Sequence, residues 1–246
     1  MQVYSYKNNN IVKEKSLINA LDIDLNKDKV ITVVGAGGKT STIFELGNEL
    51  SNLNKKTIIT TTTHMKLDKD FLLIDEDFNI ENLKKILQKN NLIKIGKKES
   101  DYKVKSLDED TLKRCIDISD FLLIEGDGSK RLPLKAPKDN EPVIIQETDL
   151  VIGLIGFDSL DKKIEETCHR PELVSKLLHK NIKENINIFD LVEIIKDKNG
   201  LKKNVDCKYK VIINKVDKLE YLDKCKKIAQ LCLEFKIDVI FTSYKI

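Results

Sequence analysis

Short, nearly continuous apolar runs alternate along this chain with longer amphipathic segments. The apolar runs lie at residues 30–34, 57–60, 121–124, 150–155, 211–213 and 239–241. Such runs are typical of strands that are covered on both faces. Helical spacing of apolar positions marks residues 39–53, 81–89, 171–178, 188–196 and 218–235. Alternation of strand and helix predicts an α/β fold with a mainly parallel sheet.

The length of 246 residues suits one large domain. We therefore predict a single domain over residues 1–246, with residues 157–205 as a small helical insertion. Two polar zones, near residues 94–105 and 196–208, are predicted to be surface loops because they lack a regular apolar pattern.

The composition indicates a globular protein and argues against membrane and nucleic-acid partners. Hydrophobic residues make up 41% and charged residues 34% of the chain, and no apolar run is long enough to span a membrane. The net charge of +3 is spread along the chain, so neither nucleic acid nor a membrane is an expected partner. Residues 1–7 lack the pattern of a secretory signal, and we expect a cytoplasmic protein. The five cysteines form no C-x-x-C pair, so Cys225 and Cys232 are expected in the core.

A glycine-rich segment between the first predicted strand and helix carries the sharpest chemical signal. Backbone amides of such a loop bind phosphate oxygens, its lysine neutralises the β and γ phosphates, and its threonine hydroxyl binds Mg²⁺. Lys39 is thus predicted to be electrostatic and catalytic, and Thr40 to be a metal ligand. The residues predicted to bind a nucleoside triphosphate here are Gly35, Ala36, Gly37, Gly38, Lys39, Thr40 and Ser41.

The spacing of this loop leaves alternatives open. The standard pattern G-x-x-x-x-G-K-[ST] would need glycine at position 33, where the chain has Val33, so the loop is a shortened G-x-x-G-K-T form. A dinucleotide fingerprint competes, but Thr40 takes its third glycine position, and residues 60–64 lack the acid that binds ribose. A purely structural glycine turn is the third interpretation.

Acidic residues follow the apolar run at 121–124. Glu125 and Asp127 stand where nucleotide-binding sheets place a ligand for Mg²⁺ or water, so both are predicted to be catalytic and metal-binding. Which of the two contacts the metal stays open, and a turn that uses them only for its backbone angles is the alternative. In the same loop, the cations Arg131 and Lys135 are predicted either to balance transition-state charge or to hold an anionic partner, against the alternative of solvated surface charge.

A second short motif, residues 214–217, has the N-K-x-D pattern by which GTPases bind guanine. One carboxylate, here Asp217, accepts from both the ring N–H and the exocyclic amine of guanine, and the stem of Lys215 can lie over the base. We predict that Asn214, Lys215 and Asp217 bind the nucleotide, with residues 241–243 as a base-side loop. The alternative is that Asp217 and Glu220 form a capping box for the next helix.

Two histidines are further candidates. His64 follows four threonines at the end of a predicted strand, and we predict that it carries a proton or acts as a ligand. Threonines are also good strand formers, which is the structural alternative. His169 and Arg170 are candidates for substrate contact, although entry into the helix at Pro171 is the favoured role.

Together these motifs resemble the YqeC family. The resemblance rests on the glycine loop, the block at 60–64, and segments 127–137, 141–144, 149–153, 168–172 and 214–217, in that order, and it spans about residues 28–245. Members are described as selenium-dependent hydroxylase accessory proteins. The resemblance implies a P-loop NTPase-like protein that helps to mature molybdenum hydroxylases carrying a labile selenium, with the client hydroxylase or its maturation machinery as partner. The Glu125 loop is also similar to that of nickel-insertion GTPases, at the level of the fold.

The combined prediction is a P-loop NTPase-like, three-layer α/β fold with helices on both faces of the sheet. The predicted reaction is Mg²⁺-dependent hydrolysis of a nucleoside triphosphate, with GTP favoured over ATP. Two other functions stay open. One is an ATP-dependent small-molecule kinase or ligase, because the shortened loop resembles that of Mur-type ligases. The other is a non-catalytic module that senses a nucleotide by binding it.

Overall fold

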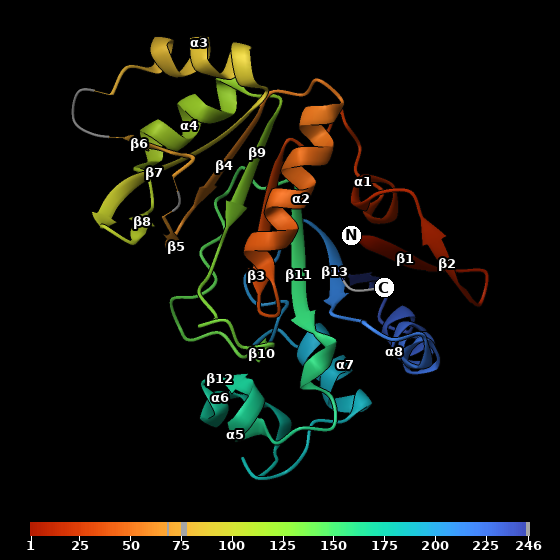
Figure 1. Cartoon of the computed structure of the whole chain (residues 1–246). Coiled ribbons are helices and arrows are strands. Elements are labelled where there is room, and N and C mark those ends of the chain that lie inside the picture. The colour runs from red at the N-terminus through yellow and green to blue at the C-terminus, as the bar shows by residue number, and fades with distance from the viewer. Residues whose placement is uncertain (68, 75–77, 245–246) are drawn as a thin grey trace.

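A twelve-stranded sheet forms the centre of the molecule (Figure 1). The computed structural model describes residues 1–67, 69–74 and 78–244. The spatial order of the strands is β2 (Asn10–Glu14), β1 (Gln2–Lys7), β14 (Asp238–Ser243), β13 (Lys208–Asn214), β11 (Leu150–Gly156), β3 (Val30–Gly35), β9 (Phe121–Glu125), β4 (Thr57–Thr61), β7 (Leu92–Ser100), β8 (Lys103–Lys105) and β5 (His64–Lys66), with β6 (Phe71–Ile74) paired to β7.

The strands from β14 to β7 in this order are all mutually parallel, and antiparallel strands extend the sheet at both sides. The predicted α/β class with a mainly parallel sheet is therefore confirmed. Strand β9 lies between β3 and β4. A dinucleotide-binding unit pairs its first two strands directly, so the strand order contradicts the dinucleotide alternative.

All six predicted strands and all five predicted helices are present. The helices are α1 (Leu17–Leu21), α2 (Lys39–Asn52), α3 (Ile80–Asn90), α4 (Glu109–Ile118), α5 (Ile164–Thr167), α6 (Pro171–Leu178), α7 (Ile188–Lys196) and α8 (Leu222–Leu233), with 3₁₀ turns at Phe157–Ser159 and Leu219–Tyr221. The predicted helix over 218–235 thus begins with a 3₁₀ turn. The pattern did not reveal α1, α4 or the N-terminal hairpin β1–β2.

Side chains of the parallel strands alternate between the two faces of the sheet, with one apolar core on one face and two on the other, which gives three layers. In β3, Ile31 and Val33 belong to the core shared with α1 and α2, whereas Val30 and Val34 belong to the cores on the opposite face. Those cores contain apolar residues of α3 and α4 near one edge and of α7 and α8 near the other. Both faces of the central strands are thus covered, which explains their continuous apolar runs.

The prediction of a surface loop at residues 94–105 is wrong, because β7 and β8 pair there as an antiparallel hairpin. Ile93, Ile95 and Val104 are buried, Lys94 lies over the ring of Phe44, and Lys98, Lys103 and Lys105 are exposed. The strong lysine content hid this alternation of buried and exposed positions. Residues 197–207, by contrast, form no helix or strand, as predicted.

The segment predicted as a helical insertion contains α5, α6, α7 and the short strand β12 (Cys168–His169). Strand β12 pairs with β10 (Leu134–Lys135), and these elements gather beyond the end of β11 in Figure 1. Cys225 and Cys232 are fully buried, as predicted, and burial raises the pKa of the Cys232 thiol to about 12. Among the described residues, no helix combines the length and apolarity needed to cross a membrane.

Candidate functional site

The glycine loop joins the carboxyl end of β3, in the middle of the sheet, to the first residue of α2. Gly35, Gly37 and Gly38 have φ angles of +97°, +87° and +124°, which side-chain-bearing residues rarely adopt. A Cβ atom on Gly37 would lie 2.2 Å from the backbone nitrogen of Gly156. The glycines are therefore required both by the backbone angles and by the closeness of the neighbouring strand.

Three amides of the loop are used to fasten it. The N–H of Gly35 donates to both carboxylate oxygens of Asp127, at 3.0 Å each. The amides of Ala36 and Gly37 donate to the carbonyl oxygens of Leu154 and Leu132, at 2.7 and 3.1 Å. Of the residues predicted to bind phosphate, those from Gly38 to Ser41 lie at the helix start, where amides have no intrahelical acceptor and attract anions.

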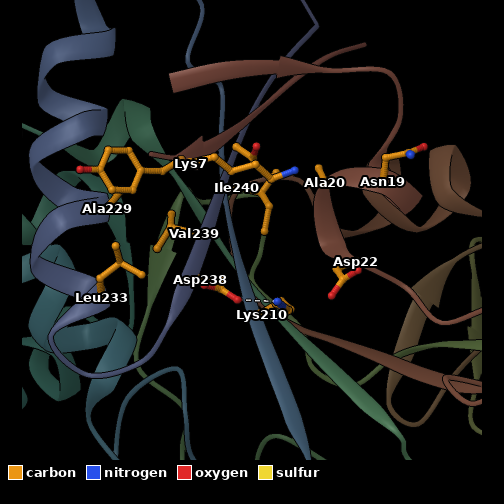
Figure 2. A pocket seen from close by; sticks show the side chains of 12 residues that line it. Lys7, Asn19, Ala20, Asp22, Lys210, Ala229, Leu233, Asp238, Val239 and Ile240 are labelled. Atoms are coloured by element: carbon orange, nitrogen blue, oxygen red, sulfur yellow. Dashed lines mark hydrogen bonds and ion pairs between the residues drawn. The ribbon is translucent and has the colours of Figure 1, made fainter. Parts of the chain in front are cut away.

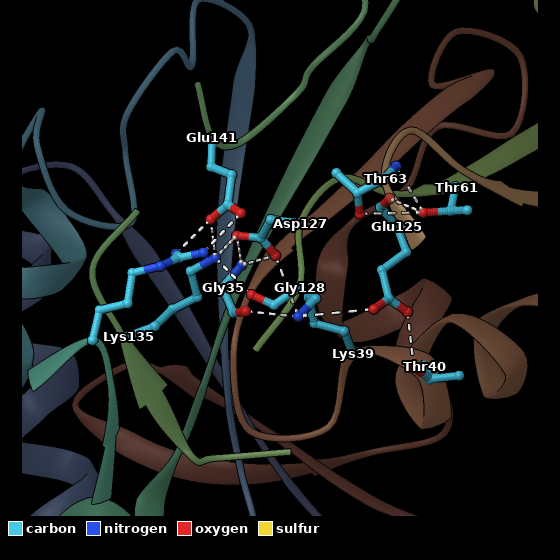
Figure 3. Close-up of polar contacts among 11 residues, drawn as sticks. Gly35, Lys39, Thr40, Thr61, Thr63, Glu125, Asp127, Gly128, Lys135 and Glu141 are labelled. Carbon is cyan, nitrogen blue, oxygen red and sulfur yellow. Dashed lines mark hydrogen bonds and ion pairs between the residues drawn. The ribbon is translucent and has the colours of Figure 1, made fainter. Parts of the chain in front are cut away.

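Lys39 is buried beneath the loop (Figure 3). Its Nζ donates to the carbonyl oxygen of Gly35 at 2.7 Å and lies 3.2 Å from Asp127 Oδ1 and 3.9 Å from Glu125 Oε1. The ammonium group is thus held between both predicted acids. The structure brings Lys39, Glu125 and Asp127 together as the sequence predicted.

The two acids have different surroundings. Both Asp127 oxygens accept from Gly35, and Oδ2 also lies 2.9 Å from the Nζ of Lys135, so this carboxylate fastens the loop. Glu125 Oε2 instead accepts from the hydroxyl of Thr40 at 2.8 Å. Burial raises the pKa of Glu125, which the Lys39 charge and the Thr40 hydrogen bond oppose, whereas Asp127 raises it further. A hydroxyl beside a carboxylate is an oxygen donor set that suits Mg²⁺, and it consists of Thr40 and Glu125.

A chain of charges runs from Asp127 away from the loop. The Nζ of Lys135 lies 2.9 Å from both Asp127 Oδ2 and Glu141 Oε2, and it donates to the carbonyl oxygen of Gly128. Arg170 donates to both oxygens of Glu141, at 2.7 and 3.0 Å. Burial raises the pKa of Glu141, but the hydrogen bonds from Arg170 and Lys135 outweigh it and hold this pKa at about 2.

Sequence reasoning did not place Glu141 in the site. Its signals were the segment 141–144 in the family resemblance and the run of charged and proline residues between 130 and 142, neither of which shows which charges pair. Arg170, considered as a substrate contact, instead pairs with Glu141 and stands at the start of α6 with a φ of +62°. Its neighbour His169 has its pKa lowered to about 4, by burial first and then by the charges of Arg170 and Lys135.

The residues of the second motif contact the glycine loop and the last strand. The amide nitrogen of Asn214 donates to the carbonyl oxygen of Gly37 at 2.9 Å, and its oxygen accepts from the Thr242 hydroxyl at 2.9 Å. Asp217 Oδ1 accepts from the hydroxyl of Ser243 at 2.8 Å. These contacts join Gly37, residues 214–217 and residues 242–243 at the carboxyl ends of the strands.

The capping alternative for Asp217 does not fit, because the N-cap position of the following 3₁₀ turn is Lys218. Lys215 has a φ of +65°, and its Nζ lies 2.8 Å from Asp158 Oδ2. A cavity of about 310 Å³ opens beside this pair and is also lined by Asp217 and Tyr221. Its size falls within the range of small-molecule pockets.

Another cavity, of about 370 Å³, lies at the opposite end of the sheet (Figure 2). Lys210 and Asp238, at the beginning of β13 and β14, form an ion pair in its wall. Ligands of parallel α/β sheets bind outside the carboxyl ends of the strands, so this amino-end cavity is not part of the candidate site.

Comparison with known proteins identifies the family. The family model described as YqeC protein matches residues 31–172, more than half of the chain. The chain belongs to the YqeC family. It is 29% identical to the uncharacterized protein YqeC of Escherichia coli K12 over 239 residues, which cover 92% of this chain and 93% of that protein. No solved structure matches the chain.

The part matched by the YqeC model contains the glycine loop, Glu125, Asp127 and the charges up to Arg170, but not residues 214–217. It also contains His64, which lies on β5 with its Nε2 atom 2.8 Å from Glu99 Oε1. The structure therefore pairs His64 with Glu99 and does not bring it into the contacts around Lys39. Within the described residues of this family member, no group of three or more His, Cys, Asp or Glu side chains is arranged to hold a metal.

Arg131 lies in an exposed turn attached to the glycine loop. Leu132, the next residue, accepts the hydrogen bond from Gly37, and its own N–H donates to the carbonyl oxygen of Ser129. Lys130 and Arg131 have φ angles of +48° and +63°, an unfavourable pair of values for residues with side chains.

Proposed function

We propose that this YqeC protein is a Mg²⁺-dependent P-loop nucleoside triphosphatase. One observation carries the proposal. The start of α2, Lys39, Thr40 and Glu125 converge at the carboxyl ends of the adjacent central strands β3 and β9. A helix N-terminus, a lysine and an oxygen pair are the parts that bind and activate a triphosphate.

The chemistry follows from these groups. The amides at the start of α2 bind phosphate oxygens, and Lys39 exchanges its contacts with Gly35 and Asp127 for the β and γ phosphates. Thr40 and Glu125 would hold Mg²⁺ beside the bound nucleotide, and the ion would neutralise phosphate charge. Arg131, in the turn fastened to Gly37, balances the charge that develops in the transition state.

GTP is the favoured substrate. Asp217, positioned by Ser243, offers a carboxylate to the two N–H donors of guanine, which adenine lacks. Asn214 links this segment to the carbonyl oxygen of Gly37, so that base and phosphates are bound by parts fixed relative to one another. The cavity between Lys215, Asp217 and Tyr221 has room beside the motif for a base.

In the cell we propose that hydrolysis drives a conformational step in the maturation of selenium-dependent molybdenum hydroxylases in the cytoplasm. The resemblance to accessory proteins of these enzymes supports this role, with a client hydroxylase or its maturation machinery as partner.

The test is nucleotide binding and turnover by the full chain. We expect Lys39→Ala to abolish binding of Mg²⁺–GTP measured by calorimetry, because it removes the ammonium group that contacts the carbonyl oxygen of the loop residue Gly35. Phosphate release should occur with GTP and be slower with ATP, and Asp217→Asn should remove that preference. Unchanged affinity after Lys39→Ala would refute the site. If ATP is turned over only with an added acceptor, the protein is a kinase or ligase. If the nucleotide binds tightly without turnover, the protein is a nucleotide sensor.

A further inference from the structure

A cavity of about 380 Å³ lies beside the end of β4, at the same edge of the sheet as the candidate site. We name it the Thr62 cavity. Its apolar wall contains Leu107, Leu112, Ile116, Val143 and Ile145, and its polar lining contains Thr62, Ser106, Glu109, Lys113, Gln146 and Glu147. Apolar and polar residues contribute about equally to this lining, and the volume of the cavity falls within the range of small-molecule sites.

Two lining residues of this cavity, Thr62 and Val143, are hydrogen-bonded to peptide groups at the end of β9. The N–H of Thr62 donates to the carbonyl oxygen of Glu125 at 3.1 Å, and the Thr62 hydroxyl donates to the carbonyl oxygen of Val143 at 2.8 Å. The N–H of Val143 in turn donates to the carbonyl oxygen of Gly126 at 3.0 Å. A ligand in the cavity would therefore touch the residues that hold Glu125 in position.

The order of the strands gives the cavity its place relative to a bound nucleotide. The guanine-binding candidate Asp217 follows β13, the glycine loop follows β3, and Glu125 ends β9. From β13 the sheet continues through β11, β3 and β9 to β4. On the proposed function, a nucleotide lying along this edge directs its terminal phosphate toward Glu125, and the Thr62 cavity comes next.

Charges at the rim indicate the class of ligand. Lys113 is paired with Glu109 at 2.6 Å, so its charge is already balanced. Glu147 is exposed and, like Glu109, raises the pKa of Lys113 through its charge, but it forms none of the ion pairs found among the described residues, so two carboxylates face one ammonium group. The rim therefore has one carboxylate in excess, which attracts a cation and repels an anion.

We propose that the Thr62 cavity binds a small organic cation with an apolar body, as a second ligand beside the terminal phosphate of the nucleotide. The apolar part packs against Leu112, Ile116 and Val143, and the positive group pairs with Glu147. Its position as a second ligand rests on the proposed function, whereas binding itself does not.

The experiment uses the full chain without nucleotide. The probe is 2-phenylethylamine, and phenylacetate is the anionic probe of similar size, both followed by methyl and amide NMR shifts of the cavity residues. We expect saturable binding of the amine at least about fivefold tighter than that of the anion. Val143→Trp, which fills the cavity, should weaken amine binding about tenfold or more, while Val12→Trp, an equally exposed valine on β2, should not change it.

A second variant keeps the proposal testable if Val143→Trp does not fold. Glu147→Gln changes an exposed side chain and should remove the preference for the amine over the anion. The proposal is overturned if the amine does not saturate by about 10 mM, if the anion binds as tightly, or if neither cavity variant changes binding. Because no nucleotide is present, these outcomes do not bear on the triphosphatase. Lys39→Ala should leave probe binding unchanged.

Discussion

Replacing Glu141 by Gln tests the buried charge chain that begins at the glycine loop. The carboxylate lies between Lys135 and Arg170 and keeps both cations paired. In Glu141→Gln, the fold and the size of the side chain are preserved, but Arg170 and Lys135 lose their shared anion. A buried ion that loses its partner destabilises a protein strongly, because its desolvation is no longer compensated.

The magnitude follows from the pKa of Glu141, about 2 in the folded protein against 4.5 for an ordinary glutamate. This difference corresponds to about 3 kcal/mol of stability at pH 7. Because the folded pKa is lowered, the contribution is complete well above pH 4.5 and is lost as the pH falls toward 2. At pH 3.5 it should be about 2 kcal/mol.

Urea unfolding of wild type and Glu141→Gln at pH 7 and pH 3.5 measures these values. Glu109→Gln is the matched control, since Glu109 forms an exposed pair with Lys113 and its loss should change the free energy of unfolding little. A difference below about 1 kcal/mol for Glu141→Gln at pH 7, or a difference independent of pH, would refute the reasoning.

Three further substitutions separate stability from function. Burial raises the pKa of Glu125, so its ionised form destabilises the fold above pH 4.5. Glu125→Gln should therefore raise the urea concentration at the unfolding midpoint at pH 7. The same substitution should reduce the Mg²⁺-dependent nucleotide affinity measured by calorimetry. Lys130→Gly should raise the free energy of unfolding by up to about 1 kcal/mol, because it relieves an unfavourable φ. Gly37→Ala should lower the melting temperature and weaken nucleotide binding, whereas Gly128→Ala, whose Cβ would meet nothing within 4 Å, should do neither.

The central strands could be predicted because their environment is simple. Strands buried on both faces, such as β3 and β9, are apolar at most positions, and this leaves a nearly continuous signal in the sequence. The hairpin β7–β8 carries lysines between its buried positions, so its signal was a weak alternation within a polar stretch.

The candidate site was predictable where the chemistry is local. Gly35 to Thr40 are adjacent in sequence, and the acid at the end of β9 is recognisable from its position after an apolar run. The different surroundings of Glu125 and Asp127 were not predictable, because they depend on partners far away in the chain, namely Thr40 for one and Lys135 with Gly35 for the other. Pairing between distant charges is decided by tertiary structure.

The hydrogen bonds of the Asn214 carboxamide determine whether fragments of the chain can keep their structure when the chain is cut. One side chain joins the turn at Gly37 to the final strand at Thr242, more than two hundred positions later. A fragment that stops before β13 would retain the glycine turn without this brace. Cutting the chain between these segments should therefore yield two fragments that restore the Asn214 contacts only when they bind to each other.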